Sequence, residues 1–317
     1  MTLKDILGTE NDIRPVILAP MAGITDFAFR SICFEYGADF AYTEMISSKG
    51  LIYGSKKTFE LIRLHEGRKI GIQLFGNEPD EIAESIRMIL DRLGDDGIAL
   101  FDINMGCPAP KIVKNGAGSA LMDEPYKAGL MIATAKKATD LPVTAKIRKG
   151  LSSVNYLEFA KRLCDNGLDM ITLHGRTREE YYSGEADWDS IRLLKENINI
   201  PVIANGNIVS RKSMGECLDY TKADGVMIAR ASLGYPGVFS ELKTGTGIPV
   251  TKEMILEHYQ LSEDEKGEYT ALKEMRKHLL WYLKGRKYAA SLKNEAVAIE
   301  NRGSFMGFVE KVFGEDL

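Results

Sequence analysis

Short apolar runs recur along the first three quarters of the chain, separated by segments in which apolar residues repeat with helical spacing. The runs predict eight strands, at Val16–Leu18, Ala38–Thr43, Lys69–Leu74, Ile98–Ile103, Pro142–Ile147, Asp169–Leu173, Pro201–Ala204 and Asp224–Ile228. They are almost continuously apolar, as expected for strands covered on both faces. Between the strands, amphipathic helices are predicted at Pro79–Leu93, Ser153–Asn166 and Ser210–Tyr220.

This alternation predicts an α/β fold, a (β/α)8 TIM barrel. A doubly wound open sheet would alternate in the same way and is the alternative. After residues 245–249 no further strand is predicted, and the pattern becomes helical at Lys252–Leu261, Tyr269–Lys284, Ser291–Ala298 and Gly303–Phe313. We therefore expect a barrel domain over residues 1–249 and a small all-helical domain over residues 250–317.

Composition and charge add one qualification to this picture. The chain has 317 residues, 44% hydrophobic and 27% charged, as is typical of a globular protein. Its formal net charge of −4 argues, taken alone, against a nucleic-acid-binding protein. Residues 273–293, however, carry seven basic residues against a single acidic one. Lys273, Lys277 and Lys284 are expected on one helical face, which is either a solvated surface or a surface for RNA phosphates.

The spacing of the cysteines and the lack of an apolar targeting segment predict a soluble cytoplasmic protein. The four cysteines are widely spaced, with no CxxC pair and no Cys/His cluster of zinc spacing. We therefore expect no metal site. The N-terminal residues lack the apolar stretch of a signal peptide. The longest apolar stretch, Val16–Ile24, is much shorter than the about 20 residues of a membrane span.

Polar or reactive residues and glycine-rich turns stand at the expected carboxyl end of almost every strand. They are Ala19–Gly23, Glu44, Gln73, Asn104–Pro108, Lys146, His174–Arg176, Asn205–Asn207 and Ala229–Arg230. In a barrel these ends together form the active site. The glycine turn and Arg230 after the last two strands suit a phosphate, so flavin mononucleotide (FMN) is one candidate cofactor. A phosphosugar isomerase or aldolase, with Lys146 as a Schiff-base nucleophile, is another interpretation.

Cys107 lies between Gly106 and Pro108, on a loop that we expect to be open. A thiol of ordinary pKa, about 8.5, is protonated at neutral pH and can donate a proton. With a lowered pKa it would instead be a nucleophile. The three cysteines in predicted helices are expected to be small buried residues: Cys33, Cys164 and Cys217.

Several of these segments, taken together, resemble the tRNA-dihydrouridine synthases. They are Leu18–Asp26 (LAPMAGITD), Gln73–Gly76 (QLFG), Asn104–Pro108 (NMGCP), His174–Thr177 (HGRT), Ala204–Gly206 (ANG) and Met227–Arg230 (MIAR). The run Arg276–Gly285 (RKHLLWYLKG) resembles the bacterial DusB-type branch of that family. The resemblance spans about residues 13–287.

The resemblance implies reduction of specific tRNA uridines to 5,6-dihydrouridine, with FMN as cofactor and NADPH as reductant. Hydride would pass from flavin N5 to uracil C6, and Cys107 would protonate C5. The resemblance assigns FMN binding to Pro20, Met21, Ala22, Gln73, Lys146, His174, Asn205, Gly206, Asn207, Ala229 and Arg230. It places the tRNA near Asn104 and Arg176, and it favours RNA binding for the stripe of Lys273, Lys277 and Lys284. The family usually has glycine at the position of Ala229 and often an acidic residue at that of Asn207.

Two other functions are open at this point. An FMN barrel of the dihydroorotate dehydrogenase type acts on a free pyrimidine and also uses the loop after the fourth strand, but it needs no helical domain. A non-catalytic RNA-binding protein would have no use for Cys107 and the flavin residues. No obligate protein partner is evident from the sequence.

Overall fold

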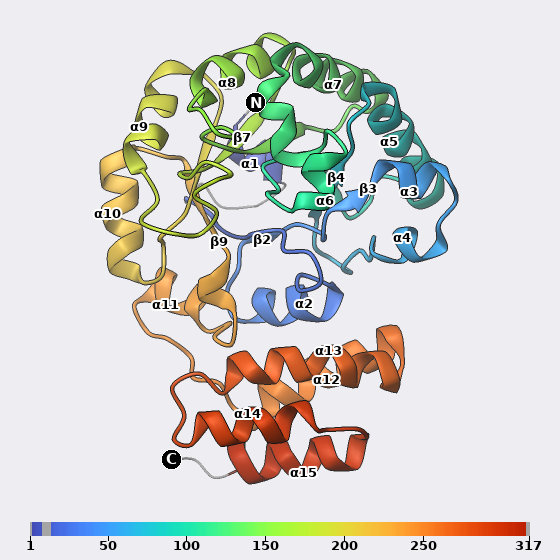
Figure 1. The fold of residues 1–317 in the computed structure, drawn as a ribbon, viewed down its shortest axis with the longest axis vertical. Helices are drawn as coiled ribbons and strands as arrows, with labels where there is room; N and C mark the ends of the chain where they lie inside the picture. Colours follow the sequence, from blue (N-terminus) through green and yellow to red (C-terminus); the bar gives the residue numbers. More distant parts are fainter. Residues whose placement is uncertain (1, 8–13, 315–317) are drawn as a thin grey trace.

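The computed structural model describes residues 2–7 and 14–314. Within these residues nine parallel strands form one sheet that curls into a barrel (Figure 1). The strands are β1 (Val16–Leu18), β2 (Phe40–Ala41), β3 (Ile46–Ser47), β4 (Ile70–Phe75), β5 (Ile98–Met105), β6 (Val143–Arg148), β7 (Met170–His174), β8 (Val202–Asn205) and β9 (Gly225–Ile228).

Their order is β2-β1-β9-β8-β7-β6-β5-β4-β3, and a bridge between Tyr42 and Gly71 joins the chain after β2 to β4. Because neighbouring strands follow the chain order and the ring closes, the barrel prediction is confirmed over the open sheet.

The second strand of the barrel is broken, which the sequence did not predict. The prediction was one strand over Ala38–Thr43, but β2 pairs with β1 and the separate β3 pairs with β4. Between them, the Thr43 N–H donates to the Gly71 carbonyl (2.9 Å) and the Thr43 hydroxyl accepts from the Gln73 N–H (3.1 Å). The Thr43 hydroxyl oxygen therefore accepts the hydrogen bond that a strand carbonyl would otherwise accept. An exchange of this kind does not alter the spacing of apolar residues, so the sequence pattern does not reveal it.

Helices cover the outside of the barrel. They are α2 (Phe27–Glu35), α3 (Ser48–Ile52), α4 (Lys56–Glu60), α5 (Pro79–Leu93), α7 (Pro125–Ala138), α8 (Tyr156–Asp165), α9 (Trp188–Asn197), α10 (Arg211–Thr221) and α11 (Val238–Thr244). The short α6 (Pro110–Lys114) and the 3-10 turn η1 (Gly118–Asp123) lie in the loop after β5, and the 3-10 turn η2 (Arg230–Ser232) lies in the loop after β9. In α5, Pro79 starts the helix, Ile82, Ile86 and Ile89 are buried, and Gly94 ends it with a φ of 70°. This helix begins and ends where predicted, α8 lies within three residues of its predicted bounds, and α10 lies within one.

Apolar side chains fill the barrel as well as the layer around it. The interior cluster includes Ile17, Phe40 and Ile203, and α1 (Leu3–Leu7) adds Ile6 and Leu7 to it. Because α1 contacts β5, it covers the end of the barrel where the strands begin. The opposite end is left open for a site.

The chain after the barrel forms four helices with a core of their own. They are α12 (Lys252–Lys266), α13 (Glu268–Tyr282), α14 (Ala289–Val297) and α15 (Arg302–Phe313). Their cluster includes Ile255, Leu279 and Phe305, and also Ile32 of α2, so α2 lies between the barrel and these helices (Figure 1). The expected boundary at residues 249 and 250 falls between α11 and α12 and stays a prediction, as do the outer limits at residues 1 and 317, which lie outside the described residues.

The helix expected to reach Lys284 ends at Tyr282. Leu283 caps it, and Gly285 then turns the chain with a φ of 83°. Lys284 therefore lies beyond the helix and does not share one helical face with Lys273 and Lys277. None of the described helices is long and apolar enough to cross a membrane.

Candidate active site

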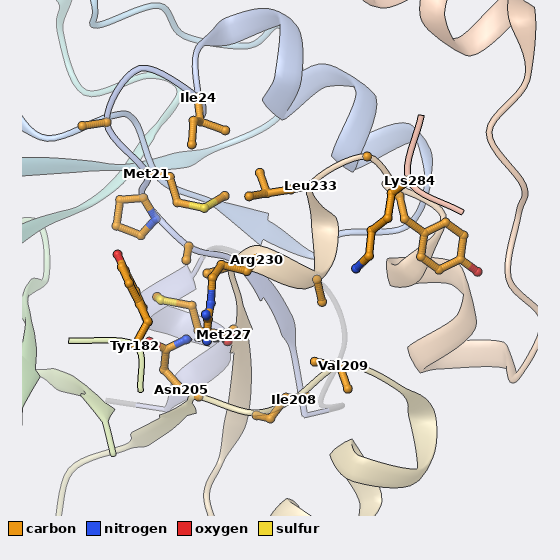
Figure 2. A pocket seen from close by; sticks show the side chains of 18 of the residues that line it. Met21, Ile24, Tyr182, Asn205, Ile208, Val209, Met227, Arg230, Leu233 and Lys284 are labelled. Atoms are coloured by element: carbon orange, nitrogen blue, oxygen red, sulfur yellow. Dashed lines mark hydrogen bonds between the residues drawn. The ribbon is translucent and has the colours of Figure 1, made fainter. Parts of the chain in front are cut away.

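The carboxyl ends of the strands open into a cavity of about 2050 Å3, which extends to the C-terminal helices (Figure 2). Every residue expected to bind the cofactor lines it: Pro20, Met21, Ala22, Gln73, Lys146, His174, Asn205, Gly206, Asn207, Ala229 and Arg230. Cys107, Asn104 and Arg176 line it as well, and Lys284 reaches it from the helical side (Figure 2). Lys273, Lys277 and the strand-end residue Glu44 are not among the lining residues.

A chain of hydrogen bonds runs across β4 and β5 to the loop of Cys107. The Gln73 amide donates to Asp102 (2.7 Å), and its oxygen accepts from the Asn104 amide (2.9 Å). The Asn104 oxygen in turn accepts from the backbone N–H groups of Gly106 (3.2 Å) and Cys107 (2.9 Å). The orientation of Gln73 and the position of Cys107 are therefore coupled through Asn104.

Asp102 is a residue of this network that the sequence reading missed. It is buried, and its second oxygen accepts from the Thr144 hydroxyl of β6 (2.6 Å). Burial raises the pKa of Asp102 to about 6, against the lowering effect of its bonds from Thr144 and Gln73. A signal was present: Asp102 and Asn104 are two apart in an otherwise apolar strand, so both face the barrel interior.

Cys107 is partly exposed and sits at the cavity, with its carbonyl accepting from the Ser119 N–H (3.1 Å) and hydroxyl (2.9 Å). Burial raises the pKa of the Cys107 thiol, although Ala109, Arg148 and Lys146 act in the opposite direction. The thiol is therefore protonated at neutral pH, which suits a proton donor better than a nucleophile. Of the other cysteines, Cys33 and Cys217 are buried and Cys164 is partly exposed.

Lys146 connects β6 to β8. Its ammonium donates to the Asn205 oxygen (3.0 Å), and the Asn205 amide donates to the Met227 carbonyl (2.8 Å). Burial, together with the nearby Arg148, lowers the pKa of Lys146 to about 8. Lys146 is therefore a cation at neutral pH that loses its charge about two pH units earlier than an exposed lysine does.

His174 is held as a neutral ring by Arg176. A guanidinium can only donate, so the His174 Nε2, 3.2 Å from Nη1 of Arg176, accepts and the ring proton is on Nδ1. Burial and the surrounding cations lower the pKa of His174. Arg176 is itself buried and donates to Gly184 (2.6 Å) and to the Asn207 oxygen (2.7 Å). Arg176 therefore uses several of its donors within the protein, and its expected contact with tRNA stays a prediction.

Arg148 is a second residue that the sequence reading missed. Its buried guanidinium donates to the carbonyls of Gly106 (2.9 Å), Thr177 (2.9 Å) and Tyr181 (3.0 Å). It thereby ties the loop of Cys107 to the loop that follows β7. Arg148 follows Lys146 at the alternation period of β6, so its direction into the barrel could have been expected.

The ends of β8 and β9 have the features of a phosphate site. Gly206 and Asn207 have φ angles of 120° and 58°, and a Cβ on Gly206 would meet Ala186 at 2.6 Å. The 3-10 turn η2 begins after Ala229 without a side-chain cap, so N–H groups at its start lack helical partners. The exposed Arg230 guanidinium lies 4.8 Å from the ring centroid of Tyr182 (Figure 2). Backbone donors and a cation at these strand ends, in a cavity that Gln73, Lys146 and His174 also line, fit a phosphorylated ring cofactor.

Comparisons with known proteins agree with this geometry. Residues 17–315 match the model of the family described as dihydrouridine synthase. A probable tRNA-dihydrouridine synthase from Rickettsia bellii is 38% identical over 306 residues, which cover 90% of this chain and 93% of that protein. The tRNA-dihydrouridine synthase B of Vibrio vulnificus is 38% identical, covering 90% of this chain and 91% of that protein. That of Proteus vulgaris is 36% identical, covering 94% of this chain and 95% of that protein.

Proposed function

Because the chain belongs to the dihydrouridine synthase family, we propose that it reduces particular uridines of tRNA to 5,6-dihydrouridine in the cytoplasm, with FMN as cofactor and NADPH as reductant. The observation that carries the proposal is the placement of Cys107. Its protonated thiol sits at the cavity on the hydrogen-bond chain that also orients Gln73. A reduction that adds hydride to one carbon of a ring needs such a proton donor for the other.

We assign the cofactor to the residues at the strand ends. Gln73 and Lys146 bind the polar atoms of the ring and ribityl chain, His174 flanks the flavin, and Pro20, Met21 and Ala22 line it. Asn205, Gly206, Asn207, Ala229 and Arg230 hold the phosphate, with backbone N–H groups and one guanidinium as donors. When bound, the flavin supplies hydride from N5 to uracil C6.

Cys107 donates the proton to uracil C5 from the opposite face of the base. Asn104 holds the backbone at Cys107 in place and lies near the uracil itself. The base must leave the tRNA stack to reach this depth, at a cost of a few kcal/mol. We propose that residues 250–317 form a tRNA-binding domain that offsets part of this cost through phosphate contacts, among them that of Lys284.

Mass spectrometry of tRNA tests the proposal. Cells that lack the gene are expected to lose dihydrouridine from defined D-loop positions and to regain it with the wild-type gene. The purified protein is expected to be yellow and to reduce tRNA with NADPH, but not free uracil. Reduction of a free pyrimidine would favour the dihydroorotate dehydrogenase type of enzyme, and a colourless protein that still binds tRNA would favour a non-catalytic RNA-binding protein.

A further inference from the structure

The loop after β1 forms one wall of the cavity and is tightly folded. The Met21 carbonyl accepts from the N–H groups of Ile24 (3.0 Å) and Thr25 (3.0 Å), and the Met21 N–H donates to the Thr25 hydroxyl (2.9 Å). At the exposed tip, Gly23 has a φ of 69°, a conformation that favours glycine. The residues assigned to the flavin, Pro20, Met21 and Ala22, lie directly before this tip.

The peptide groups of Gly23 are held from two sides. The Gly23 N–H donates to the carboxylate of Glu44, which follows β2 in the barrel. The Gly23 carbonyl accepts from the ammonium of Lys277, which lies on α13. The second bond joins the loop to the C-terminal helices, and its two residues are 254 positions apart in the chain.

A second lysine of the same helices holds the residue where the loop ends. Lys266 of α12 pairs with Asp26, and also with Glu274 of α13 (2.6 Å). Asp26 is the N-cap of α2 and accepts from the Phe29 N–H (2.9 Å). The helices therefore contact the loop at Gly23 and at Asp26, close to each other in sequence.

We infer that Lys277 is a positioning residue of the cofactor site, which holds the Gly23 carbonyl and thereby fixes residues 20–22 for FMN, and that it is not a contact for tRNA. The inference rests on the proposed FMN site. Lys277 is half-buried and engaged with the loop, whereas Lys273, one turn earlier on α13, is exposed. A loop that is ordered only part of the time lowers the apparent affinity for its ligand by that fraction. The C-terminal helices thus complete the cofactor site as well as extending the cavity.

Titration of the flavin-free protein with FMN tests this role. In the wild type, the Lys277 ammonium lies 5.8 Å from the ring centroid of Trp281. Lys277→Met keeps an apolar side chain beside this ring and removes the hydrogen-bond donor to Gly23. We expect the Kd for FMN to rise about three- to tenfold, the range for one lost hydrogen bond of ordinary strength, because the site is partly exposed. Lys277→Arg keeps a donor and is expected to restore most of the affinity. Lys273→Met, the matched control on the same helix, is expected to leave the Kd for FMN at the wild-type value.

Hydrogen exchange and a tRNA gel shift separate the outcomes. In Lys277→Met, amides of residues 21–25 should exchange faster than in the wild type, with FMN absent from both, while tRNA affinity is unchanged. Unchanged exchange together with an unchanged Kd for FMN would overturn the inference, as would a loss of tRNA affinity with FMN binding intact. If the wild type binds no FMN, the proposed function fails, and the exchange comparison still decides whether Lys277 orders the loop. Lys277→Arg provides the same readings should the Met variant misfold.

Discussion

At the residue scale, burial decides the ionisation of the groups around the cavity. It raises the pKa of Cys107, raises that of Asp102 to about 6 and lowers that of Lys146 to about 8. From the residues alone, Cys107 could be a proton donor at the ordinary pKa of a thiol or a nucleophile at a lowered one, and the raised pKa favours the donor. The sequence could not give the shifts, because they depend on neighbours from other strands, such as the Thr144 hydroxyl on Asp102.

Cys107→Ala separates the proposed proton transfer from cofactor binding. Because Cys107 is held by backbone bonds, the loop should keep its shape, and bound FMN and NADPH oxidation should match the wild type. Formation of dihydrouridine in tRNA should fall about 10²- to 10⁴-fold, the range for one general acid. Nucleoside mass spectrometry after single-turnover reaction measures it, and near-normal product from the Ala variant would rule out Cys107 as the acid.

The lowered pKa of Lys146 predicts that FMN binding depends on pH. Its pKa, lowered to about 8 by burial and then by Arg148, means that the charged form predominates below pH 8 and is lost above it. Charge-assisted hydrogen bonds are roughly twice as strong as neutral ones, so the Kd for FMN should rise as pH increases from 7 to 9. Fluorescence titration across this range should show a flat profile for Lys146→Arg, which stays charged. Parallel profiles for the two proteins would contradict the assignment.

At the element scale, the order of strands and helices was readable because the apolar runs and the amphipathic spacing differ in period. The structure departs from the predictions at single positions. Thr43 bridges the break between β2 and β3, and Leu283 and Gly285 end α13 before Lys284. Such endings depend on one or two contacts, and periodicity over ten residues does not detect them.

The hydrogen bonds of Arg148 predict that it stabilises the two loops that it joins, the loop after β5 and the loop after β7. Arg148→Met leaves the carbonyls of Gly106, Thr177 and Tyr181 without their donor. Losing charged hydrogen bonds at a buried site should lower the free energy of unfolding by about 2–3 kcal/mol. Urea unfolding of the flavin-free protein measures it, with Arg87→Met on the exposed face of α5 as the control, expected within about 0.5 kcal/mol of the wild type. Equal midpoints for the two variants would show that Arg148 does not hold these loops together.

At the scale of the whole molecule, the net charge of −4 conceals an uneven distribution. The sequence located the basic segment at residues 273–293, but it placed three lysines on one face. In the structure, Lys277 is engaged with Gly23, and Lys284 lines the cavity from beyond the helix. The sequence could not predict these different positions of Lys277 and Lys284, because they depend on how α13 packs against the barrel.

Lys284 and Lys287 follow α13 directly, are exposed and line the cavity, so we expect them to meet tRNA phosphates. Lys311 of α15 also lines the cavity, but its ammonium pairs with Glu295 (2.7 Å). Lys284→Gln combined with Lys287→Gln should weaken tRNA binding about tenfold and reduce the slope of log K against log salt by about 1 to 2. The Kd for FMN should not change. The matched control, Lys137→Gln with Lys161→Gln, removes the same charge from exposed sites on α7 and α8, on the far side of the barrel from α12–α15 (Figure 1). If both pairs weaken tRNA binding equally, the overall charge governs binding; if only the first does, tRNA is bound by the local charge of this rim.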